Sequence, residues 1–189
     1  MLTRPDHNIP EELKLLHFFD RQVDDFYLDI EFLDNYDFHL NNLANGYVNQ
    51  FIPLAIDGTG SLMVFWLQNK ETPINRAPIA YLDSEGGGTI AAKSLQEFLS
   101  LLPYDTSLFS EVGMHWTEYK LNPEITVSPY EKYTKDYYNS RYEFLFNTYP
   151  CYKDFRIWLE EEIKIQPEKN PASVIMENID SYPSFPIKY

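Results

Sequence analysis

The middle of the chain alternates short apolar runs with breaks rich in glycine or polar residues. Four such runs predict strands over residues 51–56, 61–67, 78–82 and 89–92. The second run is almost entirely apolar, which favours a strand buried on both faces or central in a sheet. The break Asp57-Gly-Thr-Gly60 predicts a turn, because glycine tolerates positive φ and aspartate can bond the backbone two residues on. The first two runs therefore form a hairpin.

Helical patterns flank this region on both sides. A first helix is expected to begin near Asn8-Ile-Pro10, where proline suits the first turn. After the strands, Ser94-Leu-Gln-Glu97 matches a capping box, in which the serine accepts the glutamate N–H and the glutamate reaches back. An apolar stripe follows the capping box, and Pro103 is expected to end the helix.

The last third of the chain gives a more mixed pattern. Ser128-Pro-Tyr-Glu131 is a second capping-box match, and another helix is expected after Tyr149-Pro150. Residues 103–127 show no regular pattern, and four prolines predict an extended tail over 167–189. Before the first strand, residues 26–43 fit either a strand or a helix.

Strands grouped in the centre with helices at both ends predict an α+β fold, since no alternation of strands and helices is visible. We expect a central antiparallel sheet of about four to six strands flanked by helices. One domain should span residues 1–189, with a core over 51–102, a tyrosine-rich helical extension over 103–166 and the extended tail.

Charge is the main compositional signal. The net charge is −14, and residues 1–50 hold ten acidic and three basic residues. Such a surface repels phosphate backbones, which argues against nucleic acid as a partner, and it attracts basic proteins. Acidic residues are therefore the candidate partner contacts, with an ordinary solvated face as the alternative: Asp20, Asp24, Asp25, Asp29, Glu31 and, in the glycine-rich turn, Glu85.

The sequence offers no catalytic, cofactor or metal constellation. Asp57 lacks the second aspartate motif of an aspartic protease, and the glycines after Glu85 lack the lysine of a phosphate-binding loop. The four histidines do not have zinc-ligand spacing. A single cysteine, Cys151, fits a reducing compartment, so we expect a cytoplasmic protein. No apolar run approaches the roughly 20 residues of a membrane span, so no membrane partner is expected.

Residues 51–102 resemble the SUKH superfamily of Smi/Knr-like proteins. The similarity lies in Phe51-Ile-Pro-Leu-Ala, the Asp57–Gly60 turn, Pro78-Ile-Ala-Tyr-Leu-Asp-Ser-Glu-Gly86 and the helix from Ser94. The residues that carry the pattern are Asp57, Gly58, Gly60, Trp66, Tyr81, Ser84, Glu85, Gly86, Ser94 and Phe98.

The resemblance implies a binding module and not an enzyme. Many bacterial members resemble immunity proteins that neutralise a toxin, often a nuclease, and fungal members are regulators of cell-wall synthesis. We therefore expect an immunity protein that binds a basic toxin domain through an acidic, aromatic-rich surface. A regulatory or scaffold protein with an endogenous partner is the alternative. A metal-dependent hydrolase has only the abundance of aspartate in its favour. The sequence leaves the oligomeric state open.

Overall fold

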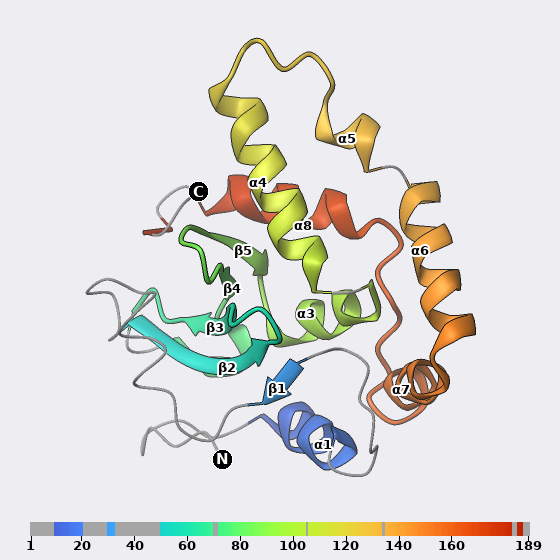
Figure 1. The fold of residues 1–189 in the computed structure, drawn as a ribbon. Coiled ribbons are helices and arrows are strands. Elements are labelled where there is room, and N and C mark those ends of the chain that lie inside the picture. Colours follow the sequence, from blue (N-terminus) through green and yellow to red (C-terminus); the bar gives the residue numbers. More distant parts are fainter. Residues whose placement is uncertain are drawn as a thin grey trace.

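The chain was analysed as a computed structural model, which describes residues 10–20, 30–32, 50–69, 72–104, 106–133, 135–182 and 185–186. The side chains of residues 17–20, 135–138 and 151 lie outside the description. The centre is a five-stranded antiparallel sheet surrounded by helices (Figure 1), so the predicted α+β fold is confirmed. Its strands follow one another in space as they do in sequence: β1 Ile30–Phe32, β2 Phe51–Asp57, β3 Leu62–Trp66, β4 Ile79–Leu82 and β5 Gly88–Ala92.

Three helices pack against β5. They are α3 Leu95–Leu101, α4 Ser107–Leu121 and α8 Pro171–Ser181, and α4 also contacts α8 (Figure 1). The helix α1 Glu11–Asp20 places Leu13 and Leu16 in the main core. The remaining helical segments are η2 Ile74–Arg76, η3 Leu102–Tyr104, α5 Pro129–Lys132, α6 Lys135–Thr148 and α7 Pro150–Glu161.

The sheet is buried on both faces. Alternate residues of β3 and β4 turn to the helices, where Phe65 and Tyr81 join a large core with Phe98 and Phe109. The residues between them, such as Trp66, form a second, smaller cluster on the opposite face. This burial confirms the prediction for the apolar run 61–67, which becomes the central strand of the sheet.

Two bulges interrupt the strand pairing. On β2 the register skips Leu54, next to Pro53, whose missing N–H is tolerated at such an irregularity. On β5 it skips Ala91. The carbonyl of Ala91 accepts a hydrogen bond of 3.4 Å from the buried side chain of Asn178 on α8. A bulge on the edge strand is thus covered by a helix that lies far away in sequence.

The capping box at Ser94 is confirmed with one difference. Ser94 Oγ accepts the N–H of Glu97 at 3.3 Å, while the Glu97 carboxylate accepts the N–H of Lys93 at 3.0 Å, one residue before the cap. The same carboxylate accepts a 2.7 Å bond from Asn178 Nδ2. At the second match, Ser128 caps the N–H of Tyr130 and not that of Glu131, and the helix lasts only four residues.

The prediction of an extended tail over 167–189 is wrong for residues 171–181, which form α8. Pro171 stands at the first helical position, where proline favours a helix, and Ile175 and Met176 of α8 enter the core. Residues 103–127 were expected to be irregular, but most of them form α4, which buries Phe109, Val112 and Trp116. Within the ambiguous segment 26–43, residues 30–32 are a strand, and the others lie outside the described residues.

We predict that Phe185→Ala lowers the free energy of unfolding by about 3–5 kcal/mol, because it opens the second face of the sheet. Phe185 is only 4% exposed, and its ring meets those of Trp66 and Phe51 edge to face at 5.2 and 6.3 Å. Urea unfolding followed by fluorescence measures the change. The matched control is Phe144→Ala on α6, because Phe144 is 61% exposed and should change stability by less than about 0.5 kcal/mol. Similar losses in both variants would contradict the assignment of the second core.

Candidate functional site

The Asp57 turn is a structural element. The buried Asp57 carboxylate accepts hydrogen bonds through Oδ1 from the N–H groups of Thr59 and Ser61, both at 3.0 Å, and from the Thr59 hydroxyl at 2.6 Å. Its Oδ2 accepts the Tyr81 hydroxyl at 2.9 Å. Burial raises the pKa of the Tyr81 hydroxyl, and the nearby Asp57 charge raises it further, so Tyr81 remains a donor at neutral pH.

A second hydrogen bond connects this turn to the neighbouring one. The Ser61 hydroxyl accepts the N–H of Ser84 at 3.1 Å, and this bond links the turn after β2 to the turn after β4. Gly60 and Gly86 have positive φ values of 86° and 105°, which explains the glycines at these positions. The other residues of the family-like pattern are also structural: Trp66 and Phe98 are buried, Ser94 is a helix cap and Gly58 is in the exposed turn.

The two predicted acidic contacts whose side chains are described do not lie together. Glu31 is exposed on β1, at one edge of the sheet, and Glu85 is exposed in the turn between β4 and β5, at the other edge. Asp24, Asp25 and Asp29 lie outside the described residues, as does the side chain of Asp20. Glu85 directly precedes Gly86 and Gly87, which line a hollow of the surface.

That hollow, which we name the outer groove, lies between the β4–β5 turn and α4 and has a volume of about 620 Å³. Met114 and Leu121 of α4 line it and are 40% and 75% exposed. Gly86 and Gly87 form the opposite wall, and a side chain at Gly86 would meet no atom within 4 Å. The groove therefore offers apolar side chains and open space beside a hairpin tip.

The border of the outer groove is acidic. Residues 83–88 contain two acids and no base, and residues 114–125 contain two acids and one lysine. Of these, Glu118 lines the groove, and Glu85 directly precedes the glycines. The lysine, Lys120, is in an ion pair with Asp180 of α8. The sequence around the groove thus holds more acidic than basic residues beside an apolar centre, which suits a basic partner.

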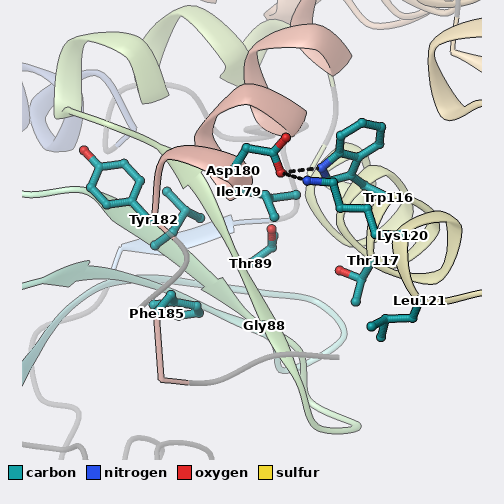
Figure 2. A pocket seen from close by; sticks show the side chains of 11 residues that line it. Gly88, Thr89, Trp116, Thr117, Lys120, Leu121, Ile179, Asp180, Tyr182 and Phe185 are labelled. Atoms are coloured by element: carbon teal, nitrogen blue, oxygen red, sulfur yellow. Dashed lines mark hydrogen bonds and ion pairs between the residues drawn. The ribbon is translucent and has the colours of Figure 1, made fainter.

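A second hollow, the inner hollow, lies between β5, α4 and the end of α8 (Figure 2) and has a volume of about 400 Å³. It shares Thr117 and Leu121 with the outer groove. On its rim, Asp180 Oδ1 accepts a bond of 3.0 Å from Trp116 Nε1 and also pairs with Lys120. The Lys120 ammonium stands 4.8 Å from the centre of the Trp116 ring.

The tyrosines of the extension are mostly packed inward. Tyr104, Tyr133 and Tyr152 are buried, and only Tyr130 and Tyr149 are large exposed rings among the tyrosines whose side chains are described. Burial raises the pKa of Tyr104 to about 12, and its hydroxyl donates to the carbonyl of Glu168. An aromatic-rich binding surface therefore receives little support from these rings, whose main role is packing.

Sequence reasoning missed the side chains of α4 that line both hollows and those of α8 that line the inner hollow. Met114, Thr117 and Leu121 follow one another at i, i+3 and i+7, a helical spacing that could have shown their common face. The buried positions Leu108, Val112 and Trp116, which recur every fourth residue, carry the same helical signal. Asp180 and Tyr182 fell within the segment that was expected to be an extended tail.

Comparison with known protein families, curated proteins and solved structures finds no match. Among the described residues, no three histidine, cysteine or acidic side chains gather in a way that could hold a metal ion. None of the described helices has the length and apolar character needed to cross a bilayer.

We predict that Tyr81→Phe lowers the free energy of unfolding by about 1–3 kcal/mol, because the buried Asp57 Oδ2 would lose the hydrogen bond that it accepts from the Tyr81 hydroxyl. Chemical denaturation measures this loss. In a double-mutant cycle with Asp57→Asn, the two losses should be less than additive, since both changes break the same bond. Fully additive losses would show that the two side chains do not interact.

Alkaline solution should weaken the fold through the buried tyrosines. The folded pKa of Tyr104 is raised to about 12 by burial, above the unfolded value near 10. The contribution of the buried Tyr104 hydroxyl to the free energy of unfolding is fully present below about pH 10. It is lost as the pH rises toward 12, because the unfolded chain releases the proton first. Denaturation midpoints measured between about pH 9 and 12 should fall less steeply in Tyr104→Phe than in the wild type. The same pH dependence in Tyr104→Phe and in the wild type would contradict this prediction.

Proposed function

We propose that this chain is a non-enzymatic protein-binding module of the SUKH immunity type, which acts in the cytoplasm and neutralises a basic toxin domain. The observation that carries the proposal is the outer groove, where the exposed Met114 and Leu121 stand inside an acidic border. The net charge of −14 supports the same reading, since it attracts basic partners over a distance.

The groove has the composition of a protein interface. Apolar side chains in the centre of an interface supply most of the binding energy, and the surrounding charges mainly set the rate of encounter and the choice of partner. Leu121 and Met114 supply the apolar centre, and Glu118 in the lining and Glu85, next to Gly86 in sequence, supply the charge. The resemblance of residues 51–102 to the SUKH superfamily adds the expectation of a toxin, often a nuclease, as the partner.

A tagged pull-down from a lysate of the source cell, read by mass spectrometry, identifies the partner. A basic toxin-like polypeptide that dissociates at high salt is the result we expect. Recovery of endogenous housekeeping proteins would replace the immunity function with a regulatory or scaffold function.

Binding kinetics with the purified partner then test the surface. We expect Leu121→Ser to weaken binding by about tenfold or more, mainly through faster dissociation, because the apolar anchor is lost. The combined change Glu85→Lys and Glu118→Lys should slow association and flatten its dependence on salt. Phe144→Ser is the matched control, since Phe144 is 61% exposed but lies on α6.

The N-terminal acidic residues provide the competing surface. A triple variant with Asp24→Asn, Asp25→Asn and Asp29→Asn removes three charges from the N-terminal segment and leaves every residue that lines the outer groove unchanged in type. If this variant loses fast association while Leu121→Ser binds normally, the partner uses the N-terminal segment and the groove assignment is wrong.

A further inference from the structure

The inner hollow has the size and lining of a small-molecule site. Its volume of about 400 Å³ lies within the range of ligand pockets, which are mostly apolar with a few placed polar groups. Figure 2 shows side chains from β5, α4 and the C-terminal segment around one space. The apolar part of the lining includes Ile90, Trp116, Ile179, Tyr182 and Phe185.

The charges on the rim favour a neutral ligand. Lys120 and Asp180 form an ion pair, and Asp180 also accepts the Trp116 indole N–H, so both charges are already compensated within the protein. A second cation over the Trp116 ring would meet the Lys120 ammonium, which is already 4.8 Å from the ring centre. An anion would meet the strongly negative field of a chain with a net charge of −14.

The side chains that line the inner hollow favour a planar aromatic ligand. Three aromatic side chains, Trp116, Tyr182 and Phe185, line the hollow together with aliphatic side chains. Aromatic rings pack well against one another in edge-to-face and offset arrangements, which add about 0.5–1.5 kcal/mol to the burial of area. A planar apolar ligand would pack against the rings at its end of the hollow, which are Trp116 on the α4 side or Tyr182 and Phe185 on the side of the second cluster.

One polar group in the lining has no partner. The Thr89 side chain is 4% exposed, and its hydroxyl makes no hydrogen bond with any of the described residues. The neighbouring Thr117 hydroxyl, in contrast, donates to the carbonyl of Gly113 at 2.9 Å. A buried hydroxyl without a partner costs about 1–3 kcal/mol, and a ligand with one hydrogen-bonding group would recover part of that cost.

The position of Thr89 follows from the fold. Thr89 stands opposite Tyr81 in the pairing of β4 with β5, and therefore its side chain turns to the helices. Gly113 of α4 allows this close approach, since a Cβ built at Gly113 would lie 2.9 Å from Thr89 Cβ. The hydroxyl is thus held at the hollow by a strand on one side and a glycine on the other.

We infer that the inner hollow binds a neutral aromatic ring with one hydrogen-bonding group, of the phenol or indole class, and that Thr89 recognises this group. The ring comes either from a free small molecule or from the tyrosine or tryptophan side chain of a protein. This inference goes beyond the proposed function and does not need the identity of the toxin.

The test is a titration of the full chain with p-cresol, followed by the NMR signal of the Trp116 indole N–H. We expect a saturable shift with a dissociation constant of about 1 mM or below. Toluene, which lacks the hydroxyl, should bind about three- to tenfold more weakly. The variant Thr89→Val should lower the affinity for p-cresol to that for toluene and leave toluene binding unchanged.

The Thr89→Val variant keeps the shape of the side chain. It removes a hydroxyl that has no hydrogen-bond partner among the described residues, so the fold should remain at least as stable. The proposal is overturned if p-cresol and indole give no saturable shift up to about 10 mM, or if Thr89→Val binds p-cresol as tightly as the wild type. Competition by N-acetyl-tyrosinamide would indicate a protein side chain as the source, and binding of p-cresol alone would indicate a free molecule. Because no protein partner is used, a failure here leaves the proposed function untouched.

Discussion

The sheet is apolar on both faces, and most of the remaining architecture follows from this constraint. A strand such as β3, whose five residues are all buried, needs a cover on each side. Helices α3, α4 and α8 lie on the side of the large core, and Tyr182 and Phe185 pack on the other side against Trp66. The chain after β5 therefore serves both faces: its helices complete the large core, and its C-terminal segment completes the small one.

Two groups of buried polar side chains connect the elements of the fold: one links strands within the sheet, and the other links α8 to the sheet. Asp57 joins the turn after β2 to β4 through Tyr81, and Ser61 extends this link to Ser84. Asn178 joins α8 to the bulge of β5 and to Glu97 of the α3 capping box. Both groups of side chains satisfy polar atoms that would otherwise be costly to bury. Asp57, Tyr81, Ser84 and Ser94 are thus structural residues, and they carry information on fold more than on a site.

Helix α4 gives each of its sides a different role. Phe109 and Val112 enter the core, Met114 and Leu121 face the outer groove, and Trp116 borders the inner hollow. Gly113 permits the approach of this helix to β5, so the distance between helix and strand is set by a residue that lines neither hollow. A binding surface and a small pocket therefore lie side by side on one helix and share Thr117 and Leu121, while Met114 lines only the outer groove and Thr89 only the inner hollow.

The sequence by itself determined strands β2 to β5, the turns at Asp57 and Gly86 and the cap at Ser94, because these depend on glycine conformations, local side-chain bonds and apolar runs of a few residues. It did not reveal α4 or α8, since these helices are stabilised by packing on β5 and on each other more than by local signals. The same reason explains the candidate sites. Glu85 was placed in a glycine turn from the sequence, and its role as a partner contact stays a prediction. Met114 and Leu121 of α4, and Asp180 of α8, line the hollows only because these helices fold onto the sheet. Only the tertiary structure decided which side chains share a hollow, because contacts between distant segments depend on how the two faces of the sheet are covered.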